Sequence, residues 1–147
     1  MYMTNLANAG IRILIAEDMM VVRQLMRDVL FKGGYKHVFV ADDGAMAWSK
    51  IQESHKENMH FDLILCDWNM PHISGIELLK MLRSHEALVV SKTPFMMITT
   101  NNEKHQVIEA LSLGANNFVI KPFTSDVLLK KIELVLGKDN YGSITNN

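Results

Sequence analysis

Cysteine is nearly absent from this chain of 147 residues: Cys66 is the single one, so no disulfide can form within the chain. Such a composition is typical of proteins that work in a reducing compartment, and we expect a cytoplasmic protein. No apolar run is long enough to span a membrane, and the N-terminus lacks the basic and apolar segments of a signal peptide. The sequence therefore predicts neither membrane insertion nor export.

An excess of one charge is also lacking, since 15 Lys and Arg residues stand against 16 Asp and Glu residues. Charges of both signs are interspersed, so no nucleic-acid surface is predicted. The glycine-rich motifs of nucleotide-binding proteins are missing, and the six histidines show no metal-ligand spacing. We therefore expect neither a nucleotide cofactor nor a zinc site. The hydrophobic content of 48% suffices for the core of one domain.

Short apolar segments alternate with helical patterns about five times along the chain. The apolar and β-branched segments predict strands at 11–16, 37–41, 61–65, 94–100 and 117–120. Helical spacing of apolar residues predicts a helix after each strand, and 85–93 is predicted to be a loop. This alternation indicates a doubly wound, flavodoxin-like α/β domain with a five-stranded parallel sheet and helices on both faces. We place this single domain at 11–137, between an N-terminal tail (1–10) and a C-terminal tail (138–147).

Capping residues mark the predicted helix boundaries. Asp43 and Thr124 are suited to cap the helices that follow them, and Ser74-Gly75-Ile76-Glu77 has the Ser-x-x-Glu pattern of a capping box. Gly33 and Gly114 are expected to end helices. These signals place the helix that contains Glu77 directly after the turn that follows Asp67.

The predicted strand ends carry the most informative side chains. These are Glu17, Asp18, Asp67, Thr99 and Lys121. Right-handed crossovers bring the carboxyl ends of parallel strands to one edge of the sheet, where α/β proteins bind their ligands. Any one of these residues could be a helix cap, a surface acid or a solvated lysine. All five at strand ends favour a functional site over that alternative.

This set of three carboxylates, a hydroxyl and an amine is suited to phosphoryl transfer. Carboxylates held close together repel one another, and a hard divalent cation such as Mg²⁺ relieves the repulsion. A carboxylate beside such an ion can attack phosphorus and form an aspartyl phosphate. Lys121 would neutralise charge on the transferring group, and the hydroxyl of Thr99 could donate a hydrogen bond to a phosphoryl oxygen.

These residues resemble the receiver domains of response regulators, and most of all the single-domain chemotaxis regulators of that family. The resemblance covers about 11–137 and rests on the segments Glu17-Asp18, Asp67-Trp68-Asn69-Met70-Pro71, Gly75-Ile76-Glu77-Leu78-Leu79, Thr99 and Lys121-Pro122-Phe123. It implies that Asp67 accepts a phosphoryl group from a histidine kinase. It also implies that Mg²⁺ is bound by Asp18, Asp67 and the backbone carbonyl of Asn69. Glu17, which stands where the family often has aspartate, would act on the ion partly through water.

The resemblance further implies a conformational switch. On phosphorylation the hydroxyl of Thr99 would move towards a phosphoryl oxygen, and the ring of Phe118 would turn from exposed to buried. The altered face, from Glu103 to Leu136, would be read by a downstream protein. Phe118 stands where the chemotaxis regulators have a tyrosine, so it keeps the ring and lacks the hydroxyl that a partner could bind.

Three further residues are expected around the phosphoryl group: Trp68, Thr100 and Pro122. The family usually has alanine or glycine where this chain has Thr100, so a larger side chain should crowd the pocket. The resemblance also implies a cis bond between Lys121 and Pro122.

Other functions can be weighed against this phosphorylatable switch. A phosphatase or phosphotransferase with an aspartyl-phosphate intermediate usually has a second acid two residues after its nucleophile, where this chain has Asn69. A phosphate sink in a relay, or a binding module that has lost phosphorylation, are further alternatives. The complete set of acids with Thr99 and Lys121 argues against the last. Cys66 precedes Asp67 on a buried strand, and we interpret it as a core thiol.

Overall fold

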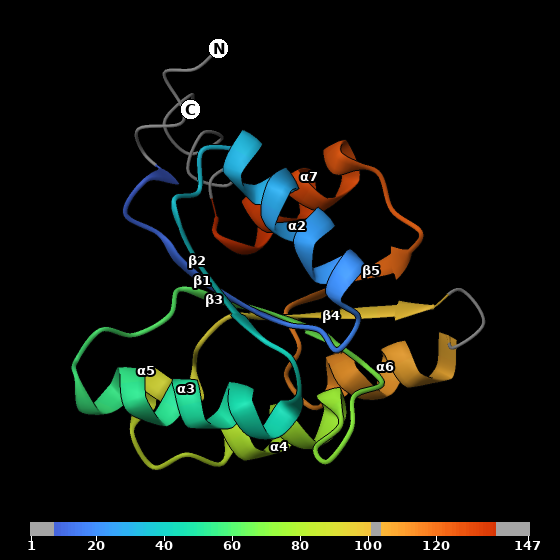
Figure 1. Cartoon of the computed structure of the whole chain (residues 1–147). Helices are drawn as coiled ribbons and strands as arrows, with labels where there is room; N and C mark the ends of the chain where they lie inside the picture. The colour runs from blue at the N-terminus through green and yellow to red at the C-terminus, as the bar shows by residue number, and fades with distance from the viewer. Residues whose placement is uncertain (1–7, 101–103, 138–147) are drawn as a thin grey trace, which may run out of the picture.

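The chain folds into three layers, with a parallel sheet between two layers of helices (Figure 1). The computed structural model describes residues 8–100 and 104–137. The sheet has the order β2-β1-β3-β4-β5. Its strands are β1 (Arg12–Ala16), β2 (His37–Ala41), β3 (Leu63–Asp67), β4 (Phe95–Thr100) and β5 (Asn117–Lys121). The five predicted strands and their parallel pairing are thus confirmed, and β3 begins two residues later than expected.

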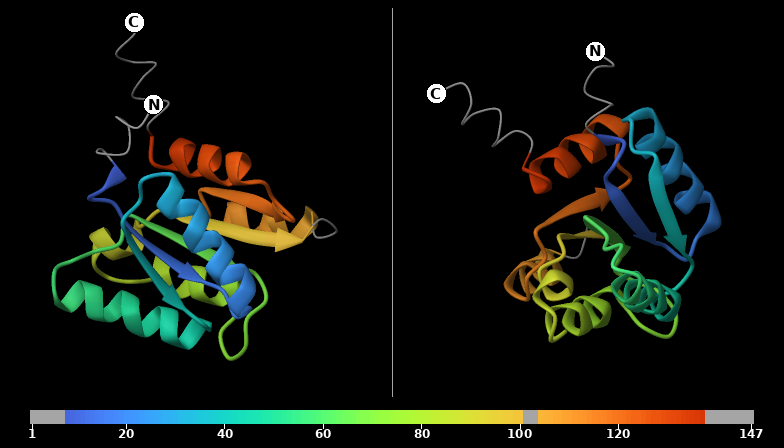
Figure 2. Two further views of the ribbon diagram at one scale, coloured as in Figure 1. Left: turned by 45° about the horizontal axis from the view of Figure 1, so that its top comes forward. Right: turned by 90° about the vertical axis from the view of Figure 1, so that its left-hand side faces the viewer.

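The helices cover both faces of the sheet. One face carries α2 (Met20–Lys32) and α7 (Ser125–Val135). The other face carries α3 (Gly44–Lys56), α4 (Gly75–Arg83), α5 (Leu88–Ser91) and α6 (Lys104–Ser112), as the turned views of Figure 2 also show. None of the helices in the described part of the chain is long and apolar enough to cross a membrane.

The tails that the sequence predicts lie mostly outside the described residues, which begin at Asn8 and end at Gly137. Within the predicted N-terminal tail, Asn8 is buried and its side-chain amide donates a hydrogen bond to the carbonyl oxygen of Gly33 at 2.7 Å. The chain is therefore fastened to the end of α2 before β1 begins.

The predicted loop at 85–93 is wrong in part, because residues 88–91 form the short helix α5. Val90 is buried against the core, and the hydroxyl of Thr93 donates a hydrogen bond to the Val90 carbonyl oxygen at 2.8 Å. A single helical turn is too short to show the 3.6-residue apolar period by which helices are found in a sequence.

Two hydrophobic cores lie on the two sides of the sheet. The central strand β3 is buried along its whole length, and its residues are all apolar up to Asp67 at its end. The core under α2 and α7 contains Ile13, Leu65, Ile98, Leu128 and Ile132, among others. The core under α3 to α6 contains Leu14, Cys66, Leu79, Met97 and Ala110, among others. The polar side chains of the strands therefore lie at or near the strand ends.

The predicted helix caps are present. Asp43, Ser74 and Thr124 each accept a hydrogen bond from the backbone N–H three residues later, at 2.7, 3.2 and 3.2 Å. They start α3, α4 and α7 respectively. Each such cap stabilises a helix by about 1 kcal/mol.

Gly75 allows α4 to start directly against the strand end that carries Asp67. A Cβ atom at this position would collide with the backbone carbonyl oxygen of Asp67 and lie 3.1 Å from the Cα atom of Trp68. The Gly75 N–H donates a hydrogen bond to the Trp68 carbonyl oxygen at 2.9 Å. The glycine in the capping box is therefore required by the close approach of helix and strand.

Arg83, the last residue of α4, connects three segments through hydrogen bonds. Its Nη1 donates to the carbonyl oxygens of Ser91 at 2.9 Å and Thr93 at 2.7 Å. Its Nε and Nη2 donate to the carbonyl oxygen of Gly114 at 3.1 and 2.7 Å, and Nη2 also reaches Asn116 Oδ1 at 3.1 Å. One guanidinium therefore fastens α5, the start of β4 and the turn before β5 to the end of α4.

We expect Arg83→Met to lower the free energy of unfolding by about 2–3 kcal/mol, because several backbone carbonyls lose a charged donor. Urea unfolding followed by far-UV circular dichroism measures this. Lys80→Met, at an exposed position of the same helix, is the matched control and should change stability by less than about 0.5 kcal/mol. Equal losses in the two variants would show that the Arg83 hydrogen bonds contribute no stability beyond that of an exposed α4 cation.

Candidate functional site

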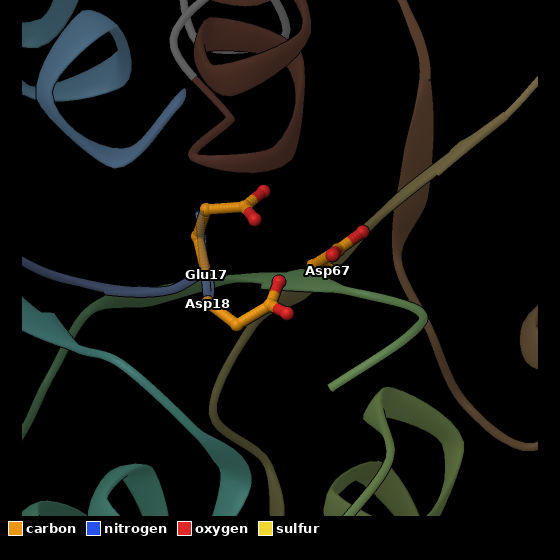
Figure 3. Close-up of side chains that lie close together, drawn as sticks. All are labelled: Glu17, Asp18 and Asp67. Carbon is orange, nitrogen blue, oxygen red and sulfur yellow. The ribbon is translucent and has the colours of Figure 1, made fainter. Parts of the chain in front are cut away.

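Three acidic side chains meet at the carboxyl edge of the sheet (Figure 3). Glu17 and Asp18 follow β1, and Asp67 ends β3, which pairs with β1. One oxygen atom from each carboxylate lies within 4.8 Å of the other two. Glu17 is fully buried, Asp67 is 8% exposed and Asp18 is exposed. The structure thus brings together the three acids that the sequence places at strand ends.

Lys121 reaches this cluster from the end of β5. Its Nζ lies 2.8 Å from Glu17 Oε1 and 3.2 Å from Asp67 Oδ1. Burial alone would lower the pKa of the Lys121 ammonium, but the hydrogen bonds and negative charges of Glu17 and Asp67 outweigh burial and raise it. Lys121 is therefore charged at neutral pH. The cis bond to Pro122, which the family resemblance implies, is confirmed.

Glu17 has further partners that sequence reasoning missed. Its Oε2 accepts a hydrogen bond from the backbone N–H of Met19 at 3.0 Å. Its backbone carbonyl accepts one from Arg23 Nη1 at 2.7 Å. Arg23 lies in the first turn of α2. The sequence signal for this contact is an arginine in the first turn of the helix that follows an acidic pair. These bonds hold Glu17 against the start of α2.

The pKa of Asp67 is raised from 3.8 to about 6. Burial is the largest cause, and the negative charge of Glu17 adds to it, while the charge and hydrogen bond of Lys121 act in the opposite direction. In the absence of an additional cation, Asp67 therefore keeps its proton to a higher pH than an ordinary aspartate does.

The other residues predicted around the phosphoryl group occupy different environments. Thr99 is buried near the end of β4, whereas Thr100 is exposed and lines a hollow on the α6 side of the sheet. Trp68 is 7% exposed and packs into the core below the site. Asn69 and Pro122 are exposed on the loops that follow β3 and β5. Only Thr99 and Trp68 are thus held by the interior of the protein.

Phe118 lies on β5, three residues before Lys121. Its ring is half-buried and packs against the core under α3 to α6. The Nζ atom of Lys131 lies 4.4 Å from the ring centroid and donates a hydrogen bond to the Phe118 carbonyl oxygen at 2.7 Å. The ring therefore occupies a position between the exposed and buried extremes that we expected for the two states of a switch.

Cys66 is fully buried beside Asp67, in agreement with its interpretation as a core thiol. Burial, together with the negative charges of Asp67 and Glu17, raises the pKa of the thiol well above its usual value. A thiol that holds its proton so firmly is a poor nucleophile.

The charges of the cluster suit a divalent cation. Three carboxylates and one ammonium leave an excess of two negative charges where the acids and Lys121 meet. All the side-chain donors are carboxylate oxygens, the ligands that hard cations prefer, and the exposed Asp18 opens the cluster to solvent. The residues present therefore fit an ion such as Mg²⁺.

A sequence model of the response regulator receiver domain family matches residues 13–133. Chemotaxis protein CheY1 of Helicobacter pylori is 36% identical over 129 residues, which cover 88% of this chain and 99% of that protein. Chemotaxis protein CheY of Pseudomonas aeruginosa is 37% identical over 129 residues, with 88% and 98% covered.

Solved structures of similar chains have the same fold. The chemotaxis response regulator CheY4 of Vibrio cholerae superimposes with a TM-score of 0.75 at 32% identity, covering 85% of this chain and 98% of that chain. A putative response regulator from Chloroflexus aurantiacus superimposes with a TM-score of 0.77 at 28% identity, with 86% and 97% covered.

The raised pKa of Asp67 predicts a pH dependence of stability in protein freed of divalent cations. Between pH 4 and pH 6 the folded protein binds more protons at Asp67 than the unfolded chain does, so the free energy of unfolding falls as pH rises through this window. Asp67→Asn removes this effect. The free energy of unfolding of Asp67→Asn, taken relative to that of the parent protein, should therefore rise by up to about 3 kcal/mol between pH about 4 and pH about 7.

Urea unfolding in the presence of a chelator, at a series of pH values, measures the difference. The exposed acid Asp42 lies outside the cluster, and Asp42→Asn is the matched control whose difference from the parent should not change over this window. If the free energies of unfolding of Asp67→Asn and of the parent protein changed with pH in parallel, the raised pKa of Asp67 would be contradicted.

Proposed function

The chain belongs to the family of response regulator receiver domains, and on this basis we propose that Asp67 is its phosphoacceptor. A histidine kinase supplies the phosphoryl group, Mg²⁺ assists the transfer, and a protein partner reads the phosphorylated state. The observation that supports this most strongly is the convergence of Glu17, Asp18 and Lys121 on Asp67 at one edge of the sheet. The proposed site of action is the cytoplasm, where a kinase has access to ATP.

In the proposed reaction a carboxylate oxygen of Asp67 attacks the phosphorus atom of a phosphohistidine. A new P–O bond forms, the P–N bond breaks, and the leaving imidazole takes up a proton from water. Lys121 Nζ, 3.2 Å from Asp67 Oδ1, is placed to neutralise charge on the transferring group. Asp18, Asp67 and the backbone carbonyl of Asn69 would hold Mg²⁺, with Glu17 acting partly through water.

The bound ion would supply positive charge to the acids and to the phosphoryl oxygens. For Asp67 to attack, its carboxyl group must be ionised, and its pKa of about 6 in the metal-free protein leaves a minor protonated fraction near neutral pH. A nearby divalent charge lowers the pKa of a carboxyl group. Metal binding and readiness for phosphorylation are therefore coupled in this proposal.

The start of α2 favours a protein as the phosphodonor. The apolar side chains of Met19, Met20, Val21 and Leu25 are 57%, 70%, 75% and 52% exposed. The first three follow Asp18 directly in the chain, so they border the acidic cluster, and Leu25 lies one turn further along α2. Apolar side chains exposed in a group commonly mark a protein contact. Because these side chains lie next to the acidic cluster, they are placed to contact the kinase domain that carries the phosphohistidine.

The proposed switch links Asp67 to Phe118 through β4 and β5. Thr99 pairs in register with Ile120, and Phe118 lies two residues earlier on the same strand. A hollow of about 350 Å³ beside the Phe118 ring has walls that are almost wholly apolar, and Thr100, Val107 and Ile120 contribute to them. When Thr99 moves towards the phosphoryl group, we propose that the Phe118 ring turns inward. Because Phe118 has no hydroxyl to desolvate, this motion costs less than it would for tyrosine.

The partner surface in this proposal is the described part of the predicted face, residues 104–136, since Glu103 lies outside the described residues. Ile108 and Leu111 on α6 are 69% and 42% exposed, and Val127 and Leu134 on α7 are 44% and 43% exposed. These apolar side chains would give a partner contacts in place of a tyrosine hydrogen bond.

We expect the protein to take up one phosphoryl group from acetyl phosphate in the presence of Mg²⁺, and Asp67→Asn to abolish this. Asp18→Ala should slow the uptake strongly, because it removes an ion ligand. Intact-mass spectrometry measures the added phosphoryl group. Asp42→Asn is the control and should react like the parent protein. If Asp67→Asn were labelled as fast as the parent, another residue would be the phosphoacceptor.

We also expect beryllofluoride with Mg²⁺, which mimics the phosphoryl group, to shift the NMR signals of Phe118 and its neighbours on α6 and α7. The same additions to Asp67→Asn should leave these signals unchanged. Thr99→Val should keep the shifts near Asp67 and lose those at Phe118, because the hydroxyl that couples them is missing. Shifts in the parent protein that stop at the loops around Asp18, Asp67 and Lys121 would favour a phosphate sink over a switch.

A further inference from the structure

The side chain of Lys131 on α7 makes two contacts with Phe118 on β5. Its Nζ atom donates a hydrogen bond to the Phe118 carbonyl oxygen at 2.7 Å and lies over the Phe118 ring, 4.4 Å from the centroid. A cation within about 6 Å of an aromatic centroid is attracted by the negative face of the ring. One ammonium group is therefore bound both to the backbone and to the ring of the residue that we expect to switch.

The hydrogen bond keeps the ammonium at β5 whichever way the ring turns. β5 lies at one edge of the sheet, so one side of its backbone has no neighbouring strand. Side chains supply partners for the Phe118 backbone instead: its N–H donates to Asn117 Oδ1 at 2.8 Å, and its carbonyl oxygen accepts from Lys131. The carbonyl is part of the sheet and does not follow the ring. Lys131 is therefore a fixed reference point for the position of the ring.

The ammonium of Lys131 has lost part of its contact with water. The side chain is half-buried, and burial lowers the pKa of the ammonium. Among residues 8–100 and 104–137, no carboxylate forms a salt bridge with Lys131. A cation attracts an aromatic ring more strongly when it is partly removed from water. The contact with the Phe118 ring is therefore not outweighed by an ion pair.

The apolar hollow beside Phe118 leads away from Lys131. Its walls come from the end of β4, from β5 and from α6. Lys131 instead lines a separate hollow on α7, together with Val127 and Leu134. The helices α6 and α7 cover opposite faces of the sheet (Figure 1). A ring that turns into the hollow therefore moves towards α6 and leaves the ammonium.

The hollow has room for the ring. Its volume is about 350 Å³, whereas a cavity of about 150 Å³ is enough to bind benzene. Apolar walls favour the inward position, and the ammonium of Lys131 favours the position seen in the structure. A contact shifts a conformational equilibrium only if it differs between the two states. The contact of Lys131 with the ring meets this condition.

From this geometry we propose that Lys131 is a positioning residue that holds the Phe118 ring out of the hollow in the unphosphorylated protein. Phenylalanine turns inward at a lower cost than tyrosine, because it has no hydroxyl to desolvate. The ammonium offsets this difference and limits how much of the inward state is populated before phosphorylation. The inference rests on the proposed function, since the inward ring marks the active state only if the proposed switch exists.

NMR of the unphosphorylated full chain tests the proposal. The nuclear Overhauser effect between the ring protons of Phe118 and the methyl groups of Val107, which lines the hollow, reports the fraction of inward rings. Lys131→Met keeps the apolar stem of the side chain and removes the ammonium. The ratio of inward to outward rings should rise about twofold to tenfold in this variant, because one cation–π contact is lost.

Two further variants are the controls. Lys131→Arg keeps a cation and a hydrogen-bond donor, so it should hold the ring as the parent protein does. Lys80→Met removes an exposed lysine from α4 and should leave the ratio unchanged. An unchanged ratio in Lys131→Met, or a rise of the same size in Lys131→Arg or Lys80→Met, would overturn the proposal.

The parent protein alone provides a test that requires no variant. The ring current of Phe118 should move the ε-methylene proton signals of Lys131 upfield of those of the exposed Lys80, because the end of the Lys131 side chain lies over the ring. Signals at the same position would contradict the contact on which the proposal depends.

Beryllofluoride with Mg²⁺ separates this inference from the proposed function. If these additions move the Phe118 signals of the parent while Lys131→Met keeps the parental ratio of ring positions, the switch stands and the role of Lys131 is refuted. If they leave Phe118 unchanged while Lys131→Met still turns the ring inward, the proposed switch fails and Lys131 still positions the ring.

Discussion

The contact of Lys121 with Glu17 and Asp67 is the interaction on which the functional edge depends. Its two short distances, 2.8 and 3.2 Å, connect the end of β5 to the ends of β1 and β3 across the sheet. Without this ammonium, three carboxylates would face one another at a partly buried edge, which is electrostatically costly. The ammonium reduces this repulsion and leaves an excess of two negative charges, which suits a divalent ion.

The same strand that supplies Lys121 also carries Phe118. The site and the proposed partner face are therefore two ends of one rigid element, with β4 beside it along its whole length. The ring of Phe118 lies between the core and an apolar hollow, with Lys131 against its face. In the proposed function the missing tyrosine hydroxyl would shift recognition on this face towards apolar contacts, for which the exposed side chains of α6 and α7 are suited.

Apolar spacing in the sequence does not show which side of a helix is buried. In α3 Ala45 and Ala47 are both apolar, but Ala45 is exposed and Ala47 is buried, and such small side chains give only a weak periodic signal. In α6 the exposed Ile108 fits the helical period as well as a core residue would. Apolar spacing identifies a helix, and it does not distinguish a face that packs on the sheet from one left for a partner.

The sequence by itself determined the five strands, the caps of α3, α4 and α7, and the placement of the acids and Lys121 at strand ends. Those features follow from local rules: apolar runs, capping side chains and the common edge of parallel strands. Only the tertiary structure decided the raised pKa of Asp67 and the hydrogen bonds of Arg23 and Arg83. Burial and contact between distant segments depend on how the layers pack, and no local pattern in the chain records that packing.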